Sequence, residues 1–266
     1  MATVTENDKF WGQDYNWPSA GDEWSELWGS AQAQWAGTLF PRIFPFLHGR
    51  FLEIAPGHGR WTQFLAERCE SLIGIDLAQS CVEHCRKRFA GLPHIEFHAN
   101  DGMVFPMVGG GSIDFAFSFD SLVHAESDVI QSYVKELARV LKPGAAAFLH
   151  HSNLGGVRRS LWDKVKRRIS GQPYHQHWRA LTVSAAQVRE FTERCGMSCI
   201  QQELVPWGMG WPLLIDCMTT VVNRPGVPCV VFENHRFMQE AAAIKRISSG
   251  HEAAPFKRAA GAGALP

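Results

Sequence analysis

The sequence has 266 residues, of which 45% are hydrophobic and 20% charged, values that are ordinary for a globular protein. The formal net charge of +0 gives no reason to expect nucleic acid or an acidic membrane surface as a partner. With no long apolar run and a polar first segment, the seven cysteines are best explained as reduced thiols of a cytoplasmic protein.

Residues 1–48 precede the first expected strand and are rich in tryptophan. Three of these tryptophans share one helical face, so the segment is predicted to form a helical, aromatic cap. Trp11, Tyr15 and Trp17 lack helical spacing. They suit a lid over a bound donor, a wall for a sugar or aromatic acceptor, or packing alone.

From about residue 49 onward, short apolar runs alternate with amphipathic segments. The runs predict five strands, "RFLEIA", "SLIGID", "HIEFHAN", "SIDFAFSF" and "AAAFLHHS". Strands that alternate with helices indicate an α/β fold with a doubly wound parallel sheet. Ligands of such sheets lie beyond the carboxyl ends of the strands. That rule selects residues 53–59, Asp76, 100–101, 118–124 and 150–153.

The second half of the sequence is less regular. Segments 154–182 and 206–228 are expected to be lid-like insertions, with a helix between them that begins at the cap Ser184. "MSCIQQELV", together with either "DCMTTVVN" or "PCVVFEN", would complete the sheet. Residues 1–250 are expected to form one domain, and 251–266 a flexible tail.

The loop "LEIAPGHGRWT" decides between possible cofactors. A dinucleotide fingerprint requires a third glycine where this sequence has Thr62. Glu53, just before the loop, would repel a pyrophosphate but suits a cationic ligand, such as the amino group or sulfonium of S-adenosylmethionine. Asp76 can accept both ribose hydroxyls, and Asn100-Asp101 can bind an adenine edge.

In this order, the residues resemble the class I S-adenosylmethionine-dependent methyltransferases. "LEIAPGHGRWT", "GIDLA" and "HANDG" look like their first three motifs, and "IDFAFSFDSLVHAE" resembles the fourth and the segment after it. The resemblance covers about residues 49–153. It implies a Rossmann-like sheet of seven strands, the last antiparallel, with helices on both faces. Ala55-Pro56 departs from the Gly-x of many members. "FWGQDYNW" and "SFDSLVHAE…HHSN" also resemble methyltransferases of bacterial glycan and natural-product pathways.

The predicted cofactor site follows from these motifs. S-adenosylmethionine, and S-adenosylhomocysteine as its product, are expected to contact thirteen residues. These are Glu53, Ala55, Gly57, Gly59, Trp61, Thr62, Asp76, Leu77, Asn100, Asp101, Gly102, Ser118 and Phe119.

Candidates for catalysis lie where the fourth and fifth strands end. His124 and His151 are the candidate general bases, and Asp120 would position the substrate or the base. His150 points to the opposite face from His151 and is expected to be a core residue; a helix cap is the alternative role of His124. Asp120, His124, Glu126 and His151 are legitimate metal ligands, but their spacing matches no known signature, so a catalytic metal is not favoured.

The predicted function is O-methylation of a hydroxyl on a sugar, glycan or related small metabolite, with a histidine as general base. Trp17, Asn153, His177 and Arg179 are expected to contact the acceptor. N- or C-methylation of a small natural product is an alternative, and a nucleotide-binding regulatory domain is a non-enzymatic one. The sequence leaves open whether the protein is a homo-oligomer.

Overall fold

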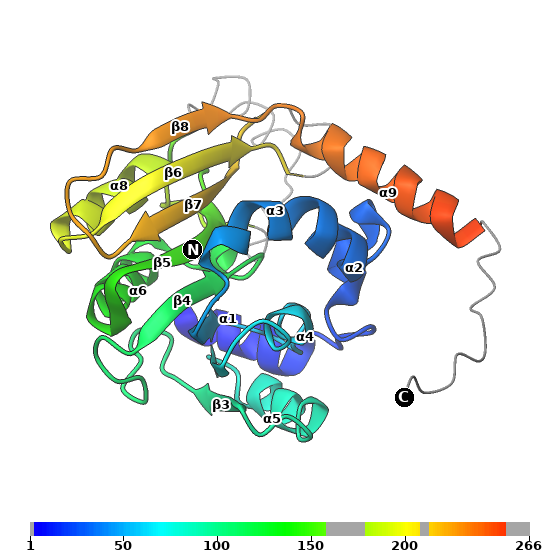
Figure 1. Cartoon of the computed structure of the whole chain (residues 1–266), viewed down its shortest axis with the longest axis horizontal. Coiled ribbons are helices and arrows are strands. Elements are labelled where there is room, and N and C mark those ends of the chain that lie inside the picture. The colour runs from blue at the N-terminus through cyan, green and yellow to red at the C-terminus, as the bar shows by residue number, and fades with distance from the viewer. Residues whose placement is uncertain (1–2, 158–178, 208–212, 254–266) are drawn as a thin grey trace, which may run out of the picture.

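A single eight-stranded sheet with the order β3-β2-β1-β4-β5-β7-β6-β8 forms the centre of the molecule (Figure 1). The computed structural model describes residues 3–157, 179–207 and 213–253. The strands are β1 Arg50–Ile54, β2 Ser71–Asp76, β3 Ile95–Ala99, β4 Ile113–Ser118, β5 Leu141–Ser152, β6 Ser198–Val205, β7 Asp216–Val222 and β8 Val230–Glu233.

Strands β1 to β5 run parallel, which confirms the predicted doubly wound α/β sheet. β7 is antiparallel to both of its neighbours, β5 and β6, and β8 pairs in parallel with β6 at the edge. The sheet therefore has eight strands rather than the expected seven. The two segments weighed as alternatives for the last strand both join it.

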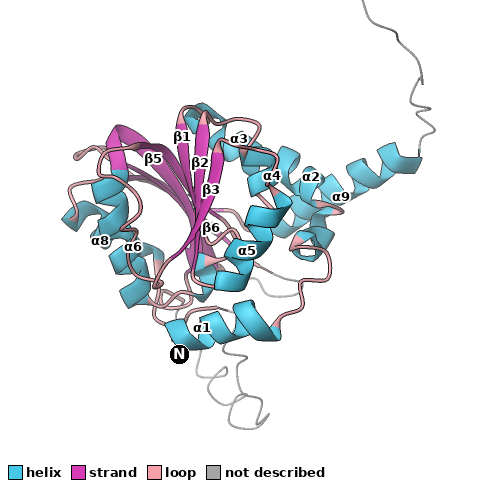
Figure 2. Cartoon of the chain, turned by 90° about the horizontal axis from the view of Figure 1, so that it is seen from below, coloured by secondary structure: helices cyan, strands magenta, loops and turns pink. Residues whose placement is uncertain are grey.

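Helices cover both faces of the sheet (Figure 2). Those before β1 are α1 Val4–Lys9, η1 Phe10–Asp14, η2 Asp22–Trp28, α2 Ala31–Gln34, η3 Trp35–Leu39, α3 Phe40–Ile43 and η4 Phe44–Phe46. The others are α4 Thr62–Leu65, α5 Gln79–Arg88, η5 Leu122–His124, α6 Ser127–Val140, α8 Ala185–Arg194 and α9 Phe237–Ala253. Within the described part of the chain, none of the helices combines the length and apolarity needed to cross a bilayer.

Alternating side chains of each strand feed two separate cores, because successive strand residues point to opposite faces. On one face Ala147 and Leu149 of β5 pack with α6 and α8. On the other face Phe148 packs with Trp28, Trp35 and residues of α9. Two of the three tryptophans that share a helical face, Trp28 and Trp35, thus lie in this core, whereas Trp24 is exposed.

Two expected boundaries need correction. Segment 206–228 was expected to be a lid-like insertion, but residues 216–222 form the buried central strand β7. The apolar and threonine side chains of 216–222 are typical of a strand. The Pro and Gly residues on both sides of them led to the interpretation of the whole segment as a loop. The expected tail at 251–266 overlaps α9, which continues to Ala253; residues 254–266 lie outside the described residues. The same is true of 158–178 within the first expected insertion.

Candidate cofactor and acceptor site

The turn after β1 contains three residues in the left-handed backbone region, and a hydrogen bond joins it to the end of β2. Ala55, Gly57 and Gly59 all have positive φ, of 55°, 57° and 85°. The N–H of Gly57 donates to Asp76 Oδ2 at 2.9 Å, and the N–H of Ala78 donates to Oδ1 at 2.9 Å. A Cβ on Gly57 would lie 2.6 Å from the Trp17 ring, so a side chain here would be strained and would displace Trp17.

Glu53 lies beneath this turn, at the buried end of β1. Its Oε2 accepts a hydrogen bond from Thr62 Oγ1 at 2.6 Å. Thr62, which stands where a dinucleotide fingerprint has its third glycine, therefore orients the Glu53 carboxyl group. Burial raises the pKa of Glu53 to about 8. A buried, protonated carboxyl group gains most from a nearby cation, which would stabilise its ionised form.

Asp76 is also buried, and burial raises its pKa to about 6 although two backbone N–H groups favour the carboxylate. Each oxygen of this carboxylate already accepts one hydrogen bond. An ionised carboxylate has roughly four acceptor positions, so capacity remains for two hydroxyl donors.

The loop after β3 offers a buried acceptor. Asn100 Oδ1 is buried without a hydrogen-bond partner among the described residues, while its Nδ2 donates to Val104 O at 3.2 Å. Such an acceptor suits an exocyclic amino group such as that of adenine. Asp101 instead accepts the N–H groups of Met103 and Val104 within its own turn. Gly102 has a φ of 77°, and an added Cβ there would lie 2.9 Å from Val4.

Other predicted cofactor residues have packing roles. Ser118 Oγ donates to Ile54 O at 2.9 Å and joins β4 to β1. Trp61 is buried, and its ring centroid lies 5.7 Å from that of Phe119. Its Nε1 is buried and has no hydrogen-bond partner in the described part of the chain. Leu77 contacts the loop at Gly102, where an added Cβ would lie 3.2 Å from its side chain.

Asp120, directly after β4, joins two arginines. It has a left-handed backbone with a φ of 68°, which is uncommon for a residue other than glycine. Arg60 Nη2 lies 2.9 Å from Asp120 Oδ2, and Arg179 Nη2 lies 4.0 Å from Oδ1. Its backbone N–H donates to His150 Nδ1 at 3.1 Å.

His150 connects Asp120 to Asp216 through its two ring nitrogens. Because Nδ1 accepts from Asp120, Nε2 carries the proton and donates to Asp216 Oδ2 at 3.1 Å. Arg179 Nε donates to the other Asp216 oxygen at 2.7 Å. Burial disfavours the Asp216 carboxylate, but the Arg179 charge and the His150 bond outweigh it and hold its pKa below the ordinary value.

The prediction that His151 is a base facing the site is wrong. The ring is buried on the face of β5 opposite to that of His150, next to Thr219 of β7. Its Nδ1 donates to Ser152 O at 2.8 Å, and Nε2 accepts from Thr219 Oγ1 at 2.8 Å. Burial lowers its pKa to about 4. His151 is therefore a neutral core residue, and it is His150 whose ring faces Asp120.

His124 lies in η5, at the carboxyl edge of the sheet. Its ring centroid is 5.0 Å from that of Trp11, and its carbonyl accepts from Asn7 Nδ2 at 3.2 Å. The cap position of α6 belongs to Glu126, so the alternative role of His124 as a helix cap is not what the structure shows.

The predicted acceptor residues are scattered. Asn153 is engaged at both ends, with Leu214 O at 2.9 Å and the Ala185 N–H at 2.9 Å. Arg179 belongs to the Asp216 group, with its guanidinium 5.3 Å from the Trp207 ring. Trp17 stacks on His58 at 4.5 Å. His177 lies outside the described residues.

The segment before β1 crosses the carboxyl edge of four strands, and Figure 2 shows α1 at that end of the sheet. Trp17 covers Gly57 after β1, and the Gly12 carbonyl accepts from Ser80 Oγ after β2 at 2.8 Å. Val4 contacts Gly102 after β3, and Asn7 binds the His124 carbonyl after β4. We name residues 3–24 the cover segment.

Arg60, Asp216 and Trp207 were missed by the sequence analysis. Arg60 stands beside the glycine loop, and its partner is 60 positions away in the sequence. Asp216 begins β7, and the antiparallel direction of β7 brings its first residue to the carboxyl edge of β5. A carboxylate at the start of the candidate segment "DCMTTVVN" was the available signal.

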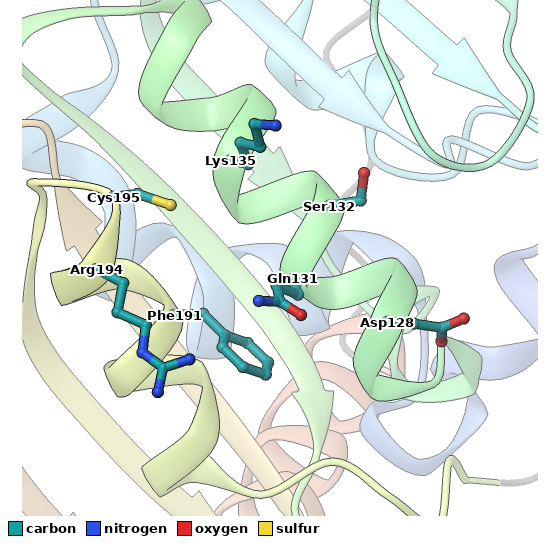
Figure 3. Close-up of a pocket in the computed structure, with 7 residues that line it drawn as sticks. All are labelled: Asp128, Gln131, Ser132, Lys135, Phe191, Arg194 and Cys195. Carbon is teal, nitrogen blue, oxygen red and sulfur yellow. The ribbon is translucent and has the colours of Figure 1, made fainter.

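Two further observations concern candidate metal ligands and the cavity beside α6. Among the described residues, no group of three or more His, Cys, Asp or Glu side chains is arranged to hold a metal. Glu126 accepts from the Thr182 N–H at 3.1 Å instead. A cavity of about 340 Å³ lies between α6 and α8, and none of the predicted site residues lines it (Figure 3). Its lining includes Asp128, Lys135 and Phe191.

Comparison with known proteins agrees with this geometry. Residues 51–144 match a family model described as a methyltransferase domain. The chain is 27% identical over 153 residues to the biotin biosynthesis bifunctional protein BioHC of Cellvibrio japonicus (strain Ueda107). The match covers 57% of this chain and 28% of the relative, so the chain spans less than a third of that relative's length.

Solved structures share the fold. The PH0226 protein of Pyrococcus horikoshii OT3 matches with a TM-score of 0.54 and 19% identity over 72% of this chain and 90% of its own. A putative methyltransferase of Haloferax volcanii, solved with the Trm112 activator, matches with a TM-score of 0.54 and 15% identity over 82% and 98%. Phospholethanolamine N-methyltransferase 2 of Haemonchus contortus gives 0.52 and 18% over 72% and 44%. The methyltransferase-domain match thus covers β1 to β4 and the start of β5, and the solved structures share the fold of the chain.

Proposed function

We propose that the protein methylates a hydroxyl of a sugar, glycan or related small metabolite, with His124 as general base. The proposal rests on the position of Glu53, Asp76 and Asn100, which follow one another along the carboxyl edge of the sheet. We call these three residues the cofactor row, and His124 lies at its end. S-adenosylmethionine, when bound, supplies an electrophilic methyl group.

The donor half of the proposal follows from charge and hydrogen bonding. Glu53 would accept the cationic methionine end, since its buried carboxyl group gains an ionic partner there. Asp76 would accept the ribose hydroxyls, and the buried Asn100 Oδ1 the adenine amino group. Trp17 and Val4 of the cover segment would exclude water from this row.

The base follows by comparing three histidines. His150 and His151 are 0% and 1% exposed, so neither ring is accessible to an acceptor that enters from solvent. His124 is half-buried at the end of β4, next to the aromatic cover segment. An aliphatic hydroxyl needs its proton removed as the new bond forms, which is the task that we assign to His124.

The acceptor would lie beside Trp207, between His124 and the Asp120 group. Trp207 is partly exposed and packs against the His150 ring at a centroid distance of 4.9 Å, and its indole is an apolar surface of the kind on which a sugar ring packs. Asp120, held by Arg60 and His150, would accept a hydrogen bond from a second hydroxyl. N-methylation of a small amine remains the alternative, because an unprotonated amine needs no base.

Two measurements test the proposal. Isothermal titration should show binding of S-adenosylhomocysteine and none of NAD; failure of the former would refute the donor assignment. Transfer of a radiolabelled methyl group is then measured on a panel of glycosides, aliphatic alcohols and small amines. The panel includes intermediates of biotin biosynthesis and phosphorylated amines, because this chain is similar to BioHC and to the Haemonchus enzyme. Labelling of amines alone would refute O-methylation.

A further inference from the structure

Two cysteine sulfurs meet at the end of the sheet remote from the cofactor row. Cys199 is the second residue of β6, and Cys229 directly precedes β8. Their Sγ atoms are 3.5 Å apart, and both cysteines are free thiols. The two strands run in parallel, so this pair lies at their amino ends.

A bulge in β6 produces this contact. The parallel register sets Gln201 opposite Val230, which by itself would bring Ile200 opposite Cys229. The pairing of β6 with β7 shifts between Cys199 and Gln201, and a bulge of this kind re-aims a side chain. The pairing is therefore a product of the local backbone, not of strand register.

The two thiols differ in access. Cys199 is buried, with 2% of its surface exposed, and burial followed by the neighbouring Cys229 thiol raises its pKa. Cys229 is partly exposed beside the edge strand β8. A solvent-borne oxidant therefore reaches Cys229 first, and Cys199 stands directly behind it as the second thiol.

We propose that Cys199 and Cys229 form a peroxide-reactive pair that closes to a disulfide between β6 and β8. In the first step the Cys229 thiolate sulfur attacks one oxygen of a hydroperoxide. The O–O bond breaks, and the leaving hydroxide takes a proton to become water, which leaves Cys229 as a sulfenic acid. The Cys199 thiol then loses its proton, its sulfur attacks the Cys229 sulfur, and the S–O bond breaks with release of a second water.

The sum is two thiols and one hydrogen peroxide giving one disulfide and two waters. The two electrons come from the thiols, and the peroxide is reduced. Closure requires the sulfurs to approach from 3.5 Å to about 2.05 Å. The short strand β8 can supply this shift because it pairs with β6 alone.

The disulfide would join the exposed edge strand β8 covalently to β6. Val230, Val231 and Phe232 of β8 are 62%, 46% and 41% exposed, and no Lys or Pro interrupts them. Edge strands of this composition are prone to open or to pair with other chains. Because the loop closed by the bond contains all of β7, the cross-link restricts the unfolded chain and should raise the melting temperature by roughly 5–10 °C.

The test uses the full chain treated with a small excess of hydrogen peroxide. After alkylation of the remaining thiols, a glutamyl endoprotease should release residues 194–203 and 204–233 as one linked pair, 2 Da lighter than the sum. Trypsin would not separate these cysteines, because Arg224 is followed by Pro225. Fragmentation of the linked pair should assign the bond to Cys199 and Cys229.

Variants make the assignment independent of fragmentation. Cys229→Ser should abolish the linked pair and the rise in melting temperature, and should leave binding of S-adenosylhomocysteine unchanged. Cys195→Ser is the matched control, since Cys195 shares a peptide with Cys199; it should keep the link. The proposal is overturned if oxidised wild type retains all seven thiols, if the link survives in Cys229→Ser, or if Cys229 stops at the sulfinic acid.

Discussion

The carboxylate of Asp76 holds the N–H of Gly57 at 2.9 Å, and this bond joins the end of β2 to the turn after β1. The residue proposed to bind the ribose thus also shapes the loop proposed to bind the methionine end. A hydrogen bond of the protein itself therefore links the proposed ribose site to the proposed methionine site.

Replacement of Asp76 should therefore weaken cofactor binding. Loss of charged hydrogen bonds to two hydroxyls predicts that Asp76→Ala binds S-adenosylhomocysteine roughly 10–100-fold more weakly in isothermal titration. Asp128→Asn, in the cavity between α6 and α8, is the control and should bind normally. Unchanged affinity in Asp76→Ala would show that the ribose lies elsewhere.

Glu53 should make cofactor binding depend on pH. Its pKa of about 8 leaves it protonated at pH 7, and the ligand's amino group favours its ionised form. Binding then releases a proton, so the affinity for S-adenosylhomocysteine should rise from pH 6 to 8 and level off above it. Calorimetry in two buffers of different ionisation enthalpy measures the released proton. In Glu53→Gln the release should disappear; a release that persists would assign the proton to another group.

His151 should contribute to acid lability. Its pKa is about 4 in the folded protein and about 6.5 when unfolded, so the unfolded chain binds more protons between these values. The stabilisation is complete above pH 6.5 and is lost as the pH falls toward 4, by roughly 3 kcal/mol. Urea unfolding at pH 4.5 and 7 should show a smaller pH dependence in His151→Gln than in wild type. Equal slopes would contradict a neutral, buried ring.

His124→Ala should separate catalysis from binding. Removal of a general base predicts turnover reduced by roughly 10²–10⁴-fold, with the affinity for S-adenosylhomocysteine nearly unchanged. His151→Gln is the comparison, because it lies on the opposite face and should keep most of its turnover. Near-normal turnover in His124→Ala would favour an acceptor that needs no base.

Trp17→Ala should speed ligand release. The ring covers Gly57 and stacks on His58, so its removal opens the cofactor row to solvent. Stopped-flow measurements should show faster dissociation of S-adenosylhomocysteine with little change in the melting temperature. Trp24→Ala, which removes an exposed ring of the same segment, should change dissociation less. Identical rates in wild type and Trp17→Ala would remove this ring from the cover.

The parallel core of the fold could be predicted from the sequence because β1, β2 and β4 are buried on both faces and stand out as apolar runs. The sequence offered β8 only as an alternative to β7, since all four residues of β8 are exposed and nothing in the pattern showed that both segments pair with β6. Alternation showed that His150 and His151 face opposite ways. It could not say which faced the site, because Ala146 and Phe148 on one side are as apolar as Ala147 and Leu149 on the other. The ion pair of Arg60 with Asp120 could not be predicted, because the two residues are 60 positions apart and come together only in the folded chain.

The cover segment also constrains the order in which the molecule is built. Asn7 and the His124 carbonyl are 117 positions apart, and the four loops under the segment come from four different strands. No single hairpin or helix pair offers it a complete docking surface, so it can settle only after β1 to β4 have assembled. The cover segment precedes these strands in the sequence and yet depends on all four of them for its docking surface.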